Sequence, residues 1–153
     1  PFLLGWVASF DFDLVGSDAP TGFGIAGGIL FAIQFFWQFP HFIAIAWVQD
    51  DDYKKAGFKM MIGGKKGSLA AITAIMCSIF MLFFTITPFY IKELGMSKLA
   101  VIIAILLGFW FTYKSIRLYI NLDDTSARGL MLSSFVYLPL LQILLVLTKY
   151  NVI

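Results

Sequence analysis

The sequence predicts an all-α membrane protein, a polytopic bundle of four full transmembrane helices preceded by the end of a fifth. Hydrophobic residues make up 60% of the 153 residues and charged residues only 13%, and the mean hydropathy is +0.88. Soluble domains carry about 25% charged residues. A soluble core of this length could not bury so much apolar surface, so lipid is the expected solvent for much of the chain.

Four apolar stretches are long enough to cross a bilayer, which takes roughly 20 residues of helix. They are residues 21–48, 68–90, 97–121 and 127–149. Residues 1–9 have the character of the tail of an earlier span, and the chain begins with Pro rather than Met. We therefore expect residues 1–153 to be the C-terminal part of a single transmembrane domain.

Basic residues near the span ends predict the orientation, because cytoplasmic loops of membrane proteins are enriched in Lys and Arg. One side of the predicted bundle collects eight basic residues, namely Lys54, Lys55, Lys59, Lys65, Lys66, Lys114, Arg117 and Arg128. The opposite side collects three, namely Lys92, Lys98 and Lys149. The loop 49–67 is therefore expected to be cytoplasmic. A net charge of +2 is too small to indicate nucleic-acid binding.

Polar side chains follow one face of the first full span. At about 100° per residue, six positions fall within roughly 40° on either side of the direction of Gln34: Gln34, Gln38, His41, Ile45, Val48 and Asp52. His41 and Asp52 would lie about 16 Å apart along an unbroken helix. Intramembrane polar groups normally face the bundle interior or a wet cavity. A structural role is the alternative: the glutamines would bond between helices, and His41 would bond to Gln38 or to the carbonyl that Pro40 frees.

The aspartates Asp50, Asp51 and Asp52 follow the first span and are expected at its C-terminal end. That end of a helix carries partial negative charge, so three carboxylates there need compensation by lysines or by a divalent cation. Clustered carboxylates suit Mg²⁺, which typically bridges them to substrate phosphates. Read alone, three such residues are most often a solvated helix end.

A basic group is predicted on the same side of the membrane. Lys114, Arg117 and Asn121 share a face near the end of the third full span, and Arg128 follows in the sequence. Arg makes bidentate contacts to phosphate and Lys provides a point charge, although side chains at these positions can also snorkel to the interface. Carboxylates for a metal and cations for phosphate together favour a membrane enzyme that handles a diphosphate.

The run "WQFPHFIAIAW…DDDYKKAGF" resembles the second aspartate-rich region of the haem O synthase (protohaem IX farnesyltransferase) branch of the UbiA-type intramembrane prenyltransferases. The matching residues are Trp37, Gln38, Pro40, His41, Phe42, Asp52, Tyr53, Ala56 and Gly57. The last two spans are similar to the same family through Arg117, Asp123, Asp124, Ala127, Arg128, Ser134 and Tyr137. The resemblance covers essentially the whole chain. The chain departs from the family pattern at two places: Ile62 stands where the family usually has Pro, and the pair Gln49 and Asp50 stands where a basic residue is common.

The resemblance implies that the chain is the second half of a nine-helix bundle with a central cavity. It implies Mg²⁺-assisted transfer of a farnesyl group from farnesyl diphosphate to a vinyl group of haem B, which gives haem O for haem–copper oxidases. Asp51 and Asp52 would hold Mg²⁺. Substrate contacts would come from Trp37, Gln38, His41, Tyr53, Lys114, Arg117, Asn121 and Arg128.

The resemblance further implies a bacterial-type inner membrane, and haem A synthase or oxidase assembly proteins as partners. The family's first aspartate-rich motif belongs to the other half, so this chain alone is expected to be inactive. Three alternatives stay open: a prenyltransferase for a quinone-ring acceptor, half of a transporter with a site built on His41 and Asp52, and a non-catalytic haem-binding protein.

Overall fold

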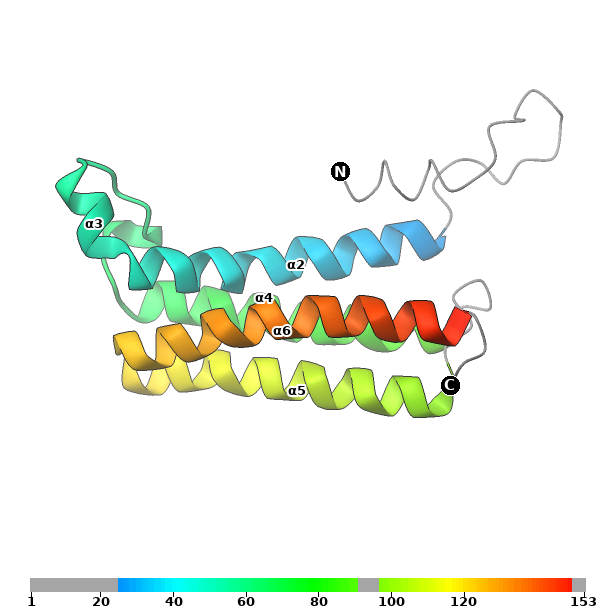
Figure 1. Cartoon of the computed structure of the whole chain (residues 1–153). Helices are drawn as coiled ribbons and strands as arrows, with labels where there is room; N and C mark the ends of the chain where they lie inside the picture. The colour runs from blue at the N-terminus through cyan, green and yellow to red at the C-terminus, as the bar shows by residue number, and fades with distance from the viewer. Residues whose placement is uncertain (1–24, 91–96, 150–153) are drawn as a thin grey trace, which may run out of the picture.

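The described residues, 25–90 and 97–149 of the computed structural model, form an antiparallel bundle of four long helices (Figure 1). These are α2 (Ile25–Val48), α4 (Ser68–Ile86), α5 (Lys98–Asn121) and α6 (Asp124–Lys149). Shorter elements are α3 (Asp50–Lys55) and the 3₁₀ turns η1 (Ile62–Gly64) and η2 (Thr87–Tyr90). Helix α2 packs on α4 and α6, and both of these pack on α5. The predicted all-α class is confirmed.

All four long helices are apolar and long enough to cross a membrane, so the chain is an integral membrane protein. The expected spans 21–48 and 68–90 correspond to α2 and to α4 followed by η2. The expected tail of an earlier span at residues 1–9 lies outside the described residues. Helix α6 begins at Asp124 rather than at 127 because the Asp123 carboxylate accepts a hydrogen bond from the Ser126 N–H at 2.8 Å and caps the helix.

The bundle core combines small residues with a few large ones. Fully buried alanines lie on α4 and α5, which lets the helices approach closely: Ala70, Ala71, Ala74, Ala100 and Ala104. Tyr137 of α6 stacks on Phe111 of α5, and its hydroxyl lies 2.7 Å from Thr85 Oγ1 of α4. That hydrogen bond satisfies the phenol of Tyr137 in a fully buried position.

Gly108 marks a close approach of α4 and α5. A Cβ atom at this position would lie 2.5 Å from Leu82 Cδ1. We expect Gly108→Val to lower the free energy of unfolding by about 1–3 kcal/mol relative to Gly28→Val, because a Cβ at Gly28 meets nothing within 4 Å. Unfolding of the protein in mixed micelles measures the difference. Adding Leu82→Ala should recover part of the loss, and equal stability of the two valine variants would contradict the close approach.

Candidate functional site

A histidine centre joins α2 to α6. His41 Nδ1 lies 2.7 Å from the Ser134 hydroxyl oxygen, and Trp37 Nε1 donates to the Ser134 backbone carbonyl at 3.1 Å. The rings of Trp37 and His41 stack with their centroids 4.5 Å apart. Since residues 37 and 41 are one helical turn apart, both side chains reach the same residue of the neighbouring helix. The structure thus brings two of the predicted substrate-binding residues together.

His41 lies just below the outer surface of the seam between α2 and α6. Its side chain is only 9% exposed, and it is flanked by the rings of Phe135 at 5.1 Å and Phe42 at 5.4 Å. Both phenylalanines are themselves exposed, at 52% and 62%. The expected local partners of His41, Gln38 and the carbonyl freed by Pro40, are not the ones it uses. Its partner, Ser134, comes from α6.

A cavity of about 380 Å³ lies next to the histidine centre, because Phe42, whose ring contacts His41, is one of its lining residues. Its wall carries Gln38 and Phe42 of α2, Tyr53 of α3, and Met60, Met61 and Ile62 of the following loop. The amide of Gln38 and the phenol of Tyr53 are its polar groups, and the rest of the lining is apolar. A mostly apolar hollow with a few polar groups is typical of a site for a small organic ligand.

The predicted polar stripe does not continue to Asp52. Helix α2 ends at Val48, and α3 turns away from its axis after Gln49 (Figure 1). The 16 Å separation along an unbroken helix therefore does not apply. Gln34 and Gln38 also differ from the expected interhelical bonding, since Gln34 Oε1 is buried with no hydrogen-bond partner among the described residues and Gln38 lines the cavity.

The three aspartates do not lie at the C-terminal end of the first span, where the sequence predicted them. Asp50, Asp51 and Asp52 form the first turn of α3 rather than the last turn of α2, and carboxylates are favourable at a helix N-terminus. Lys54 pairs with Asp50 at 2.6 Å, and Lys55 pairs with Asp52 at 3.0 Å. These hydrogen bonds raise the pKa of both lysines. The cluster therefore needs no metal ion for its own stability.

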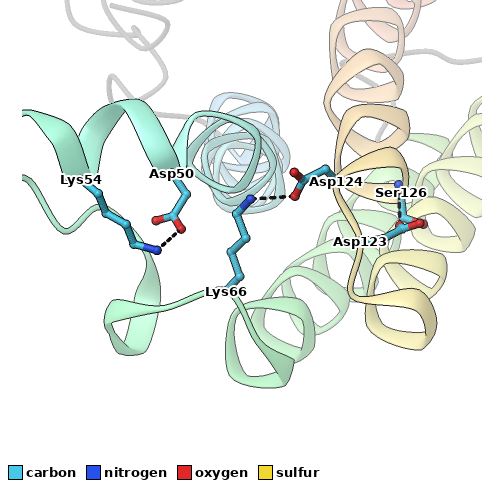
Figure 2. A network of polar contacts seen from close by, with 6 residues as sticks. All are labelled: Asp50, Lys54, Lys66, Asp123, Asp124 and Ser126. Atoms are coloured by element: carbon cyan, nitrogen blue, oxygen red, sulfur yellow. Dashed lines mark hydrogen bonds and ion pairs between the residues drawn. The ribbon is translucent and has the colours of Figure 1, made fainter.

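The three carboxylates differ sharply in exposure. The Asp50 side chain is 4% exposed, whereas that of Asp52 is 81% exposed, and Asp51 is also exposed. Asp50 is thus the buried carboxylate of the three, and its ion pair with Lys54 lies within α3 (Figure 2). Asp51 and Asp52, the predicted metal ligands, face outward and are open to a ligand. In the described part of the chain, no three His, Cys, Asp or Glu side chains are grouped so as to hold a metal ion.

A third ion pair ties the start of α6 to the loop before α4. Lys66 Nζ lies 2.7 Å from Asp124 Oδ1, and the lysine reaches across to α6 in Figure 2. Beside it, Asp123 caps α6, and its hydrogen bonds to Ser126, helped by the charge of Arg117, lower the pKa of the Asp123 carboxyl. The acidic pair Asp123 and Asp124 is therefore already engaged within the bundle.

The predicted phosphate-binding residues gather at this same end. Lys114, Arg117 and Asn121 lie on the last two turns of α5, and Arg128 lies on the second turn of α6. Asn121 donates to the Ser126 hydroxyl at 2.9 Å, which gives it a local structural bond. Lys114 is half-buried, whereas the two arginines are exposed. No ion pair involves Lys114, Arg117 or Arg128 within residues 25–90 and 97–149.

Comparison with known sequences decides the family. The profile of the UbiA prenyltransferase family matches residues 1–138. The chain belongs to the UbiA prenyltransferase family. This UbiA-family chain is 41% identical over 152 residues to a protein of Flavobacterium psychrophilum named protoheme IX farnesyltransferase, a match covering 98% of the chain and 47% of that protein.

Other relatives give the same pattern. A protein of Flavobacterium johnsoniae with the same name is also 41% identical, over 98% of this chain and 47% of its own length. A mitochondrial protein of Homo sapiens, named protoheme IX farnesyltransferase, is 29% identical over 97% of the chain and 31% of its own length. The UbiA-family chain thus spans about half the length of the bacterial relatives named here. No solved structure matches it.

Two residues of the UbiA-family site have structural roles that sequence patterns did not assign. In the sequence, Ser134 only matches the family pattern. No neighbouring residue marks it as the hydrogen-bond partner of a histidine 93 positions earlier. In the sequence, Asp50 is one of three adjacent aspartates and stands where the family commonly has a basic residue, and neither feature indicates that it is buried. Its burial follows from the break at Gln49, which apolar periodicity does not reveal because the residues that follow it, Asp50, Asp51 and Asp52, are polar.

Proposed function

We propose that this chain is the second half of a haem O synthase, which transfers a farnesyl group from farnesyl diphosphate to a vinyl group of haem B. The observation that carries the proposal is 41% identity, over 98% of the chain, to proteins named protoheme IX farnesyltransferase. The histidine centre also supports the proposal. Trp37 and His41, which pack against each other in it, both belong to the run that resembles the haem O synthase branch. The product, haem O, serves haem–copper oxidase assembly.

The prenyl-transfer step forms one carbon–carbon bond and breaks one carbon–oxygen bond, and the later addition of water forms a new carbon–oxygen bond and breaks one O–H bond. The bond between the allylic carbon of the farnesyl group and the diphosphate oxygen breaks, and the bonding electrons stay with the diphosphate. The resulting allylic cation is captured by the vinyl group of haem B. Water then adds to the other vinyl carbon and releases a proton, which leaves a hydroxyethylfarnesyl group. The cavity with Gln38 and Tyr53 on its wall, which is otherwise lined by apolar side chains, is proposed to hold the reacting groups.

Asp51 and Asp52 are the residues that would hold Mg²⁺. Two exposed carboxylates fit a cation that is commonly bound through one or two carboxylates together with substrate phosphates. Lys55 would have to release Asp52, and their contact is an exposed one that costs little to break. Bound Mg²⁺ supplies neutralisation of the negative charge that develops on the leaving diphosphate.

The charged end of the bundle is proposed to face the cytoplasm of a bacterial inner membrane. The excess of basic residues at this end and the bacterial relatives support that assignment. Lys114, Arg117, Asn121 and Arg128 at the same end are proposed to receive the diphosphate, and haem A synthase or an oxidase assembly protein is proposed to receive haem O.

The proposal is tested by assaying the full-length protein in lipid bilayers. With haem B, farnesyl diphosphate and Mg²⁺, the expected product is haem O, identified by its mass. Replacing haem B by quinone-ring acceptors should give no prenylated product. Prenylation of a quinone ring instead of haem would overturn the acceptor assignment, and absence of any prenyl transfer would favour a transporter or a haem-binding protein.

Arg117 provides a separate test of the diphosphate site. Arg117→Lys keeps the charge but removes the bidentate fork, so we expect the KM for farnesyl diphosphate to rise about 10-fold and the KM for haem to change little. Equal effects of Arg117→Lys on both substrates would indicate that Arg117 acts through packing or snorkelling.

A further inference from the structure

The histidine centre contains a chain of three groups that ends at His41. The Ser134 hydroxyl oxygen lies 2.5 Å from the Met131 carbonyl oxygen one turn earlier in α6, and 2.7 Å from His41 Nδ1. Ser134 is fully buried, so neither bond competes with water. The chain therefore runs from a backbone carbonyl, through a hydroxyl, to one nitrogen of the imidazole.

The number of protons fixes the direction of both bonds. A carbonyl oxygen can only accept, so the single hydroxyl proton of Ser134 is donated to Met131. The same hydroxyl then has only lone pairs left for His41, and Nδ1 must be the donor. In a neutral imidazole one nitrogen carries the proton and the other a lone pair. Nε2 consequently holds the free lone pair.

We infer that Ser134 is a positioning residue that holds His41 as the Nδ1–H tautomer and so presents the Nε2 lone pair to the iron of the haem substrate. Histidines that bind metal ions almost always donate their other N–H to an oxygen acceptor, which fixes the tautomer and the orientation of the ring. A histidine is also a common axial ligand of haem iron. The inference deepens the proposed function and rests on it for the identity of the ligand.

The surroundings of His41 support a ligand rather than a second internal bond. Nε2 has no hydrogen-bond partner within the described residues, and the flanking rings of Trp37, Phe42 and Phe135 offer no acceptor or donor to it. Phe42 and Phe135 are exposed apolar rings at the edge of the seam, and such rings suit the flat apolar face of a porphyrin.

Nitrogen NMR of the full-length protein, labelled with ¹⁵N-histidine and studied in bilayers without haem, tests the tautomer directly. The His41 signals are those that disappear in His41→Gln. At about pH 8, where imidazole is neutral, we expect a protonated signal for Nδ1 and an unprotonated one for Nε2. Ser134→Ala should shift the population towards Nε2–H. A wild-type Nε2–H tautomer, or a Ser134→Ala spectrum identical to wild type, would overturn the inference.

The adjacent residue supplies a matched control. Ser133 is equally buried and donates to the Leu130 carbonyl at 2.7 Å, but it has no contact with His41 among the hydrogen bonds of the described chain. Ser133→Ala therefore removes a buried hydroxyl from the same helix and should leave the His41 signals unchanged. In Ser134→Ala the Trp37 bond survives, because its acceptor is the backbone carbonyl.

Haem titration followed in the Soret band tests the ligand. Ser134→Ala should weaken haem B binding about 10-fold, at the lower end of what loss of such a supporting bond costs, whereas Ser133→Ala should bind haem as the wild type does. Unchanged affinity in Ser134→Ala, despite a shifted tautomer, would show that Nε2 is not the ligand. Failure of the wild-type protein to bind haem would instead refute the proposed function and leave the tautomer result standing.

Discussion

Replacing Asp52 by Asn in the full-length protein is expected to lower farnesyl-transfer turnover by about 100-fold, which corresponds to roughly 3 kcal/mol of barrier. The carboxylate lies on α3 at the charged end of the bundle, matches the family motif, and is 81% exposed. An amide has nearly the same shape but no charge to offer a divalent cation. Haem binding should be largely retained, because His41 lies within α2 and Asp52 lies beyond its end.

Asp50→Asn is the informative comparison for this prediction. Asp50 is buried and paired with Lys54, so its loss should lower thermal stability while leaving the turnover of the folded protein close to wild type. Turnover per folded molecule, measured at saturating Mg²⁺, distinguishes the two roles, because only Asp52→Asn should lower it. Near-normal turnover of the Asp52→Asn protein under those conditions would remove Asp52 from the metal site.

The fold was largely predictable because each span is governed by one dominant force. Apolar stretches of this length have no other stable arrangement than helices in lipid, and connectors rich in charged and turn residues separate them. The remaining errors lie at helix ends, where a single hydrogen bond decides the boundary. The cap from Asp123 to Ser126, for example, starts α6 at Asp124.

The site was less predictable because it depends on contacts between distant residues. Helical periodicity placed Gln38, His41 and Asp52 on one face, but the break at Gln49 removed Asp52 from it. The same periodicity cannot say which neighbouring helix a residue meets. Gln38 reached the cavity, while His41, three residues later, reached Ser134 on α6. Periodicity also could not tell the three adjacent aspartates apart, because neighbouring residues in one turn point in different directions: Asp50 is buried, whereas Asp51 and Asp52 are exposed.

Removing the imidazole of His41 is expected to change haem binding more than any other property of the protein. In His41→Ala the affinity for haem B should fall by about 10- to 100-fold, and the Soret and visible bands of bound haem should shift because an axial nitrogen ligand is lost. Affinity for farnesyl diphosphate should stay nearly unchanged, since the proposed diphosphate residues lie on α3, α5 and α6.

Trp37→Phe serves as the control for loss of packing at the same seam. It keeps an aromatic ring beside His41 but removes the bond from Nε1 to the Ser134 carbonyl, so it should lower stability without altering the haem spectrum in the way His41→Ala does. His41 also bonds Ser134 across two helices, and a purely structural role would make His41→Ala resemble Trp37→Phe. A destabilised His41→Ala protein with an unaltered haem spectrum would therefore assign the histidine to helix packing alone.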